Sequence, residues 1–284
     1  MKRCRKAIKT NPGEGENMDL KIKDKIAVVT GGGNGIGRAI ALRLAAEGAR
    51  VVVADLNKEA AAKVIAEIKA QSGDGMAIAA DATRPEDVDN MVRKTLTAYG
   101  VIDILVNNVG GGTGGTALIA ETLTDNWDKT IEMTLKSTFL ACRAVAKSMA
   151  ERKRGRIINI ASISGKSGEA LIGAYCAAKF GVLGLTQTLA RELARYDITV
   201  NAVCPGYVYT PGWEKLAQAL KDSRPALADK SLQEIFKARV KSVTPLRRPQ
   251  APEDIASLVA YLASEEARNI TGQAINVDGG AVMG

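Results

Sequence analysis

The stretch Thr30-Gly31-Gly32-Gly33-Asn34-Gly35-Ile36-Gly37 indicates the fold of this chain more strongly than any other part of it. It continues the short apolar run Ile26–Thr30 and opens an amphipathic helical pattern over 36–48. Glycines let a strand turn sharply into a helix and let backbone N–H groups approach a phosphate, while the helix N-terminus adds partial positive charge. A glycine cluster in this context predicts a dinucleotide-binding turn rather than a turn that is only structural.

Short apolar strands alternate with amphipathic helices along the rest of the chain. We expect further strands at 51–55, 76–80, 102–106, 156–160, 198–203 and 273–277, and further helices at 58–71, 83–98, 123–150, 174–195 and 252–263. This alternation is typical of right-handed parallel βαβ units, and continuously apolar strands indicate a sheet with helices on both faces. The prediction is a single-domain α/β fold, a doubly wound Rossmann-like parallel sheet of about seven strands.

Two helix ends and one irregular stretch complete this outline. Gly48 is placed to cap the first helix, and Thr83-Arg84-Pro85-Glu86 has the spacing of a capping box. Regular patterning stops between 205 and 245, where we expect a substrate loop that acts as a lid. Its apolar residues could exclude water from a reaction, or could simply pack an insertion; they are Trp213, Leu216, Leu220, Pro225, Leu227, Leu232, Ile235 and Phe236.

The composition excludes several kinds of chemistry. The 284 residues include no histidine, which rules out Ser-His-Asp and Cys-His catalysis and histidine-containing zinc sites. Proton transfer must therefore use Tyr, Lys, Ser, Cys, Asp or Glu. The cysteines form no CxxC pair and no metal spacing, so we expect buried, reduced thiols in a cytoplasmic protein; they are Cys4, Cys142, Cys176 and Cys204.

The net charge of +8 comes from 39 Lys and Arg against 31 Asp and Glu. Residues 1–17 hold part of this excess and have neither apolar periodicity nor the apolar core of a secretory signal. We interpret them as a basic, disordered tail or the product of an upstream start codon, preceding a domain at 18–284. No apolar run reaches the roughly 18 residues of a transmembrane helix, so no membrane partner is expected. The basic tail is only weak evidence for binding nucleic acid, and no nucleic-acid partner is expected either.

Asp55 ends the second expected strand, 18 residues after Gly37. A carboxylate there can accept hydrogen bonds from the adenosine ribose hydroxyls and would repel a 2′-phosphate. Asn34 occupies the position in the turn where a protein that binds the 2′-phosphate of NADP would need Arg or Lys. Both features favour NAD over NADP, although Asp55 could also serve only as a cap.

Three further residues form a candidate acid–base group. Tyr175 and Lys179 are four residues apart and so share one face of the expected helix. A nearby ammonium should lower the Tyr pKa from about 10. Ser162, just past the strand at 156–160, could meet the same substrate oxygen. A Tyr-x-x-x-Lys spacing alone is weak evidence, but here it accompanies the glycine turn.

Together these motifs resemble the short-chain dehydrogenase/reductase family, over residues 20–284. Thr30–Gly37 matches its TGxxxGxG, 107–110 its NNAG with Val for Ala, and 205–210 its PGxVxT. The resemblance implies that Ser162, Tyr175 and Lys179 are catalytic. It also implies a set of cofactor-binding residues: Gly31, Gly33, Asn34, Gly35, Ile36, Gly37, Asp55, Leu56, Asp81, Ala82, Asn108, Gly110, Tyr175, Lys179, Pro205, Gly206, Val208 and Thr210.

One position departs from the family. Its catalytic Asn usually lies seven residues after the tryptophan of the long helix, and counting from Trp127 gives Thr134. In the family that Asn bends the helix and holds a water beside the lysine. Thr134 could bind water through its hydroxyl. This departure leaves three hypotheses open: a slower enzyme, a proton relay by another route, or a catalytically weak NAD-binding regulatory protein.

The resemblance implies hydride transfer between NAD and a secondary alcohol or ketone, in a homotetramer built on the two long helices. Thr210-Pro211-Gly212-Trp213 is similar to the lid start of acetoin/butanediol and polyol dehydrogenases in the family. The alternative is a 3-oxoacyl-carrier-protein reductase using NADPH. Its acidic partner could suit the basic run 152–154, which could equally be a solvated helix end. No metal is expected.

Overall fold

The computed structural model describes residues 19–112 and 117–283. Seven parallel strands form one sheet in the order β3-β2-β1-β4-β5-β6-β7. Their bounds are Ile26–Thr30 (β1), Arg50–Asp55 (β2), Gly75–Ala79 (β3), Ile104–Asn107 (β4), Gly155–Ile160 (β5), Ile198–Pro205 (β6) and Ala274–Val277 (β7). The order reverses between β1 and β4, and ligands of such sheets bind beyond the carboxyl ends of the strands at that point.

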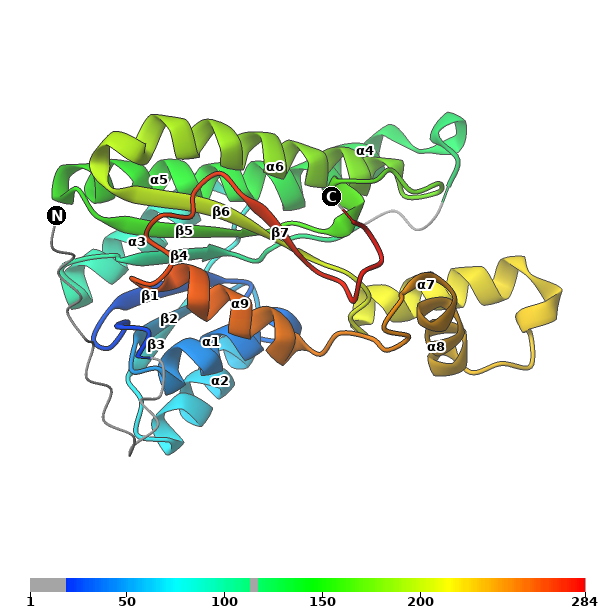
Figure 1. The fold of residues 1–284 in the computed structure, drawn as a ribbon, viewed down its shortest axis with the longest axis horizontal. Helices are drawn as coiled ribbons and strands as arrows, with labels where there is room; N and C mark the ends of the chain where they lie inside the picture. The colour runs from blue at the N-terminus through cyan, green and yellow to red at the C-terminus, as the bar shows by residue number, and fades with distance from the viewer. Residues whose placement is uncertain (1–18, 113–116, 284) are drawn as a thin grey trace, which may run out of the picture.

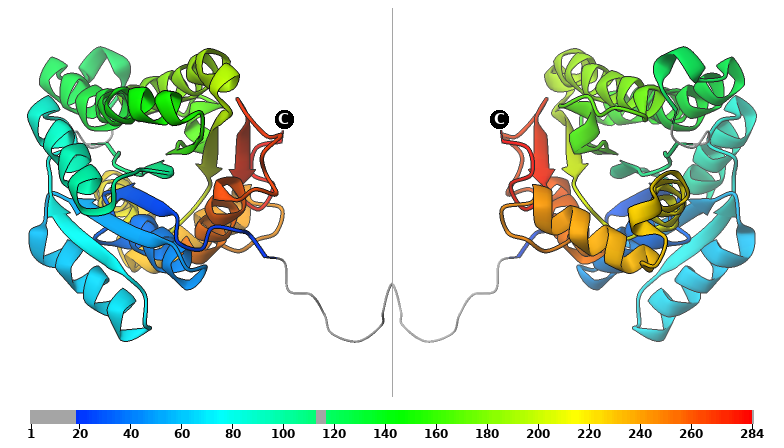
Figure 2. Two further views of the ribbon diagram at one scale, coloured as in Figure 1. Left: turned by 90° about the vertical axis from the view of Figure 1, so that its left-hand side faces the viewer. Right: turned by 90° about the vertical axis from the view of Figure 1, so that its right-hand side faces the viewer.

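Helices cover both faces of the sheet (Figures 1 and 2). One face carries α1 (Gly35–Ala46), α2 (Lys58–Ala70) and α9 (Pro252–Ala263). The other carries α3 (Pro85–Tyr99), α5 (Ser137–Arg152) and α6 (Gly173–Leu193). Strand side chains alternate between the faces, so Ala27 and Val29 join one core cluster while Val28 joins the other. The predicted doubly wound Rossmann-like fold is confirmed.

The signals at two helix ends gave one correct and one wrong prediction. Gly48 has φ +86°, and the amides of Gly48 and Ala49 donate to Ala45 and Leu44, so α1 ends in a Schellman turn as expected. The capping box at 83–86 does not form, because α3 begins with Pro85 and Arg84 is its N-cap.

The expected helix at 123–150 contains a change of pitch. It consists of α4 (Thr124–Ile131), a π-helical turn at Glu132–Lys136, and α5. Hydroxyls serve the carbonyls within this turn: Ser137 Oγ donates to Met133 O at 2.7 Å, and Thr138 Oγ1 donates to Thr134 O at 2.8 Å. Side-chain hydroxyls of this kind favour a bent helix. The resemblance led us to expect a bend near this position, and the π-helical turn lies there with Thr134 at its centre.

The prediction that 205–245 is irregular was wrong. After β6 the chain forms α7 (Pro211–Ser223), a 3₁₀ turn and α8 (Leu232–Val243), which extend beyond the carboxyl end of β6 (Figure 1). Thr210 Oγ1 caps α7 by accepting from the Trp213 amide, and Ser231 with Glu234 forms a complete capping box for α8. The sequence contains these capping residues. No strand lies between the two helices, however, so they do not fit the βαβ alternation from which the other helices were predicted.

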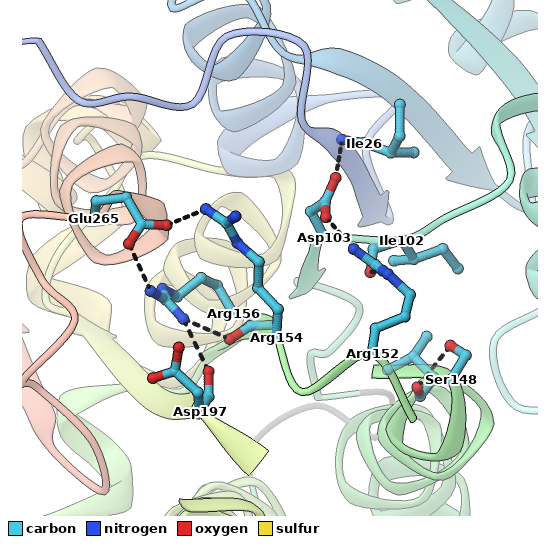
Figure 3. A network of polar contacts seen from close by, with 11 residues as sticks. Ile26, Ile102, Asp103, Ser148, Arg152, Arg154, Arg156, Asp197 and Glu265 are labelled. Atoms are coloured by element: carbon cyan, nitrogen blue, oxygen red, sulfur yellow. Dashed lines mark hydrogen bonds and ion pairs between the residues drawn. The ribbon is translucent and has the colours of Figure 1, made fainter. Parts of the chain in front are cut away.

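Ion pairs fasten the opposite, amino end of the sheet (Figure 3). Asp103 accepts from the Ile26 amide at 3.0 Å and from Arg152 Nη2 at 2.6 Å, so it joins β1 to the end of α5. Glu265, after α9, pairs with both Arg154 and the buried Arg156. Two cations of the basic run 152–154 are thus engaged within the domain, so the run is not a simply solvated helix end.

The expectations about the cysteines and about membrane-spanning helices concern residues in the described ranges and in the tail. Cys142, Cys176 and Cys204 are buried free thiols, as predicted, while Cys4 and the tail at 1–17 lie outside the described residues. Across 19–112 and 117–283, no helix has the length and apolarity needed to cross a bilayer.

Candidate active site

The glycine turn joins β1 to α1 through a very close approach. A Cβ atom on Gly37 would lie 2.1 Å from Gly31 O, so only glycine fits there, and Gly31 itself has φ +60°. Asn108, after β4, donates through Nδ2 to Gly31 O at 2.9 Å and holds the turn against the neighbouring strand. The exposed Asn34 is the N-cap of α1 but gives no side-chain cap. The first-turn amides of α1, from Gly35 to Gly37, are therefore left facing the turn, where an anion can bind them.

Asp55 lies at the carboxyl end of β2, directly beside this turn. Its Oδ2 accepts from the Gly33 amide at 2.8 Å, and its Oδ1 accepts from the Asn57 amide at 2.9 Å. Each carboxylate oxygen keeps a further lone pair for a hydroxyl donor. Leu56, the next residue, is 75% exposed and offers a flat apolar surface beside the carboxylate.

The remaining candidate cofactor residues follow the ends of β3, β4 and β6. Asp81 Oδ1 accepts from both the amide and the hydroxyl of Thr83, which shapes the segment Asp81-Ala82. Val208 forms a parallel bridge with Gln250, whose side chain accepts from the Tyr207 amide at 2.7 Å. The structure brings the residues predicted to bind cofactor to the same carboxyl edge of the sheet, on either side of its switch point.

Ser162, Tyr175 and Lys179 come together at the ends of β5 and α6. Ser162 caps a 3₁₀ turn by accepting from the Ser164 amide at 3.1 Å, which fixes its side chain. Lys179 is 3% exposed, and its Nζ donates to Ile160 O at 2.7 Å. The same Nζ lies 5.7 Å from the centre of the Tyr175 ring. The hydroxyl of Ser162 reaches that of Tyr175 closely enough to hydrogen-bond.

The electrostatics of this group differ from the expectation. Burial raises the pKa of Tyr175, and the hydrogen bond from Ser162 opposes that rise without cancelling it. Burial also lowers the pKa of Lys179 to about 8, because it penalises the charged ammonium. The pKa of Tyr175 in the chain by itself is therefore raised and not lowered as expected, because desolvation is its largest influence.

Thr134 is fully buried beside the same group. Its Oγ1 accepts from the Gly111 amide and donates to the Gly111 carbonyl, both at 3.2 Å. A Cβ on the adjacent Gly110 would lie 3.0 Å from Lys179 Nζ and 3.5 Å from Thr134 Oγ1. The hydroxyl that could bind a water already donates to and accepts from the backbone of the loop that borders Lys179, and one acceptor lone pair is left.

A cavity of about 220 Å³ adjoins Tyr175 and is formed by residues that sequence reasoning had not assigned to the substrate. Its walls include Leu123 at the start of α4, Glu121 before it, and Leu171 and Ile172 on the loop leading into α6. The available signal was the apolar stretch 117–123, which is separated from the NNVG motif at 107–110 only by the glycine-rich segment 111–116. Leu118, Ile119 and Leu123 of this stretch are more than half exposed.

The residues present fit a dinucleotide. The turn excludes every side chain at Gly37, the α1 amides can meet a pyrophosphate, and the Asp55 carboxylate suits a diol rather than a second anion. The residues expected to hold the nicotinamide end follow β4 and β6, on the side of the sheet edge that also carries Tyr175 and Lys179.

Comparisons with known proteins agree with this geometry. The family model described as short chain dehydrogenase matches residues 25–221. A 3-oxoacyl-[acyl-carrier-protein] reductase of Synechocystis is 42% identical over 91% of this chain and 97% of its own length. A crystal structure of NAD+-bound xylitol dehydrogenase superposes with a TM-score of 0.85 at 31% identity, covering 92% of this chain and all of that one. Levodione reductase superposes with a TM-score of 0.84 at 32% identity, over 92% and 98%.

Proposed function

The chain belongs to the short-chain dehydrogenase/reductase family and is an oxidoreductase of that family, and on this premise we propose that it interconverts a secondary alcohol and a ketone with NAD(H). The observation that carries the proposal is the meeting of Ser162, Tyr175 and Lys179 at the sheet edge that also holds the glycine turn and Asp55. Polyols, acyloins and similar small hydroxy compounds are the substrate class we favour.

The nicotinamide supplies or accepts the hydride when the dinucleotide is bound. The proton belongs to Tyr175, whose hydroxyl donates it to the carbonyl oxygen during reduction and takes it back during oxidation. Its raised pKa keeps the phenol protonated at neutral pH and so supports the acid role. Ser162, fixed as a cap, donates a hydrogen bond to the same oxygen as negative charge develops there.

Lys179 acts beside Tyr175 rather than on the substrate. With a pKa of about 8 it carries its charge through most of the neutral range, and that charge favours the phenolate needed for alcohol oxidation. Its bond to Ile160 O directs Nζ across the space between α6 and the strand ends. From there it can also donate to a ribose hydroxyl.

The preference for NAD rests on Asp55. A 2′-phosphate at the ribose position would meet this carboxylate, and the exposed Asn34 offers no compensating cation. That the superposing xylitol dehydrogenase was crystallised with NAD+ supports the same choice.

A second candidate is reduction of a 3-oxoacyl thioester, favoured by the 42% identity to the Synechocystis 3-oxoacyl-[acyl-carrier-protein] reductase. The site chemistry is the same, since this substrate is also a ketone. Two observations weigh against it: Asp55 disfavours NADPH, and Arg152 and Arg154 are paired with Asp103 and Glu265 instead of being available to an acidic carrier.

One assay separates these possibilities. Oxidation of NADH and of NADPH is followed with a panel of small ketones, acyloins and a 3-oxoacyl thioester, and the reverse reaction with polyols. NADH turnover on the small ketones supports the proposal, and a preference for NADPH with the thioester supports the second candidate. Cofactor binding without turnover on any substrate would instead identify a regulatory protein.

A cytoplasmic homotetramer remains part of the proposal. The support is apolar surface on α5 and α6, where Phe139 and Phe180 are 44% and 47% exposed. Aromatic side chains of this kind are enriched at self-complementary interfaces. Light scattering at micromolar concentration should give four times the chain mass, and a Phe180→Lys variant should dissociate. A purely monomeric protein would contradict this assembly.

A further inference from the structure

The lid formed by α7 and α8 lies next to the 3₁₀ turn that follows Ser162. Its aromatic cluster contains Trp213, Phe236 and Tyr209, with Trp213 and Phe236 ring centres 4.9 Å apart. Ile163, the residue after Ser162, packs against a cluster of buried side chains that includes Phe236 and Val240 of α8. The position of the lid is therefore coupled to the site where the substrate oxygen would bind.

An ion pair crosses from the lid to the loop that leads into Tyr175. Arg239 of α8 places Nη2 2.8 Å from Glu169 Oε1. Glu169 is in turn tied to the start of α6, because its amide donates to the sulfur of Cys176, next to Tyr175, at 3.3 Å. The lid helix is thus joined, through two side chains, to the helix that carries the proposed acid–base residue.

On the lid side of this pair, the Arg239 guanidinium lies against the ring of Tyr207. Arg239 Cζ lies 5.9 Å from the centre of the buried Tyr207 ring, and Tyr207 also contacts Trp213. The side-chain oxygen of Gln250 accepts from the Tyr207 amide at 2.7 Å, and the backbone amide of Gln250 donates to the Tyr207 carbonyl at 3.0 Å. The guanidinium can therefore rest on Tyr207 whether or not Glu169 is bound.

We propose that Glu169 and Arg239 form a salt-sensitive latch that closes the lid over the substrate and opens to admit and release it. This inference rests on the proposed function. Both side chains are 42% exposed, and exposed ion pairs shift an equilibrium only by a factor of about 1.5 to 5. That is too little to determine the fold but enough to set the fraction of open lid. The two charges are positioning residues, and neither touches the reacting atoms.

The latch can be read without turnover, because the chain has only two tryptophans. In a Trp127→Phe background, the emission of Trp213 reports on the lid, and acrylamide quenching measures its exposure. Raising ionic strength from 0.01 to 1 M shortens the Debye length from about 30 to about 3 Å. We expect quenching of Trp213 to rise with salt, and Glu169→Gln or Arg239→Gln to show the raised quenching already at low salt.

Three comparisons make this test specific. The double variant should behave like either single variant, and the exchange Glu169→Arg with Arg239→Glu should restore low quenching and its salt dependence. The control Glu47→Gln, which removes the comparably exposed pair with Arg43 on α1, should leave Trp213 unchanged. Once a substrate is known, the latch variants should raise its KM about 1.5- to 5-fold while kcat is maintained or increased.

The outcomes separate the latch from the proposed reaction. If the protein turns over a ketone but Trp213 quenching changes neither with salt nor in the variants, the latch is wrong and the proposed reaction is not affected. A working latch in a protein that reduces no ketone would overturn the reaction. Should a single variant fail to fold, the salt titration of the parent and the charge exchange still decide the question.

Discussion

The hydroxyl of Thr134 hydrogen-bonds to both polar backbone atoms of Gly111, accepting from its amide and donating to its carbonyl at 3.2 Å. This clamp holds the loop that borders Lys179, since a side chain on Gly110 would already crowd Nζ. The hydroxyl that could have bound a water is thereby used to position backbone. The π-turn around Thr134 keeps the helix bend, with Ser137 and Thr138 covering the carbonyls that the bend exposes.

The clamp predicts a difference between two conservative replacements. Thr134→Val keeps the shape of the side chain but leaves both Gly111 groups without a partner, which should destabilise the fold by about 1–3 kcal/mol and weaken NAD binding. Thr134→Ser keeps the hydroxyl and should retain both properties. Chemical denaturation and cofactor titration measure them. Equal behaviour of the two variants would show that the hydroxyl bonds are unimportant.

Thr134→Asn tests the relay separately. If protons leave through a water beside Lys179, Asn should preserve or raise kcat and sharpen its dependence on pH, because Asn can bind both a backbone group and a water. A kcat and pH profile identical to those of the parent would mean that position 134 has no relay role.

Lys179 predicts an unusual dependence of stability on pH. Its pKa falls from 10.5 in the unfolded chain to about 8 in the fold, so between these values the unfolded state binds more protons. Stability should therefore rise with pH in this window, since the burden of a buried charge present below pH 8 is progressively relieved. The full effect is about 3 kcal/mol.

Denaturant titrations between pH 7 and 9.5, without added dinucleotide, measure this slope. Tyr175 works in the opposite direction near and above pH 10, because its raised pKa lets the unfolded chain release its proton first. Lys179→Met removes the buried charge and should be more stable than the parent at pH 7, with a flatter profile up to pH 9.5. A parent whose stability is constant or falls from pH 8 to 9.5 would contradict the lowered pKa.

The sequence predicted best where local signals and topology agree. The glycine turn, the apolar strands and Gly48 each indicate the local backbone conformation from their own residues. The parallel arrangement of the strands follows from the strand–helix alternation. The lid at 205–245 was predicted, but its two helices were not. α7 and α8 have clear caps at Thr210 and Ser231, yet no strand lies between them, so they do not fit the strand–helix alternation.

The candidate site was predictable in position and less so in electrostatics. That Ser162, Tyr175 and Lys179 meet follows from their placement beyond β5 and on one face of α6. The pKa directions depend on how far each group is desolvated, which spacing does not encode. The Thr134 clamp and the Glu169–Arg239 pair each join a helical residue to a loop far away in the sequence, and no local pattern marks either one.

Asp55 predicts cofactor choice. NAD should be preferred over NADP by at least about tenfold in kcat/KM, or roughly 1.4 kcal/mol. Asp55→Ala should narrow this gap, and Asp55→Asn should narrow it too while keeping an acceptor for the Gly33 amide. The Asn variant thus separates the carboxylate charge from its support of the turn. Equal or better kcat/KM with NADP in the parent would refute the assignment.

Tyr175→Phe is the decisive variant for the proposed chemistry. It removes the group placed to exchange the substrate proton, so turnover should fall by at least about 10³-fold, while NAD binding persists because the glycine turn and Asp55 are untouched. Ser162→Ala should lower turnover less, since it removes one hydrogen bond and no proton. Lys179→Ala should lower both turnover and cofactor affinity, because its Nζ faces Tyr175 and the dinucleotide side of the site together. Cofactor titration and steady-state kinetics on the same samples distinguish these three patterns. Substantial activity in Tyr175→Phe would mean that another group moves the proton. With no histidine in the chain, that group would have to be another tyrosine, a serine, lysine, cysteine, carboxylate or bound water.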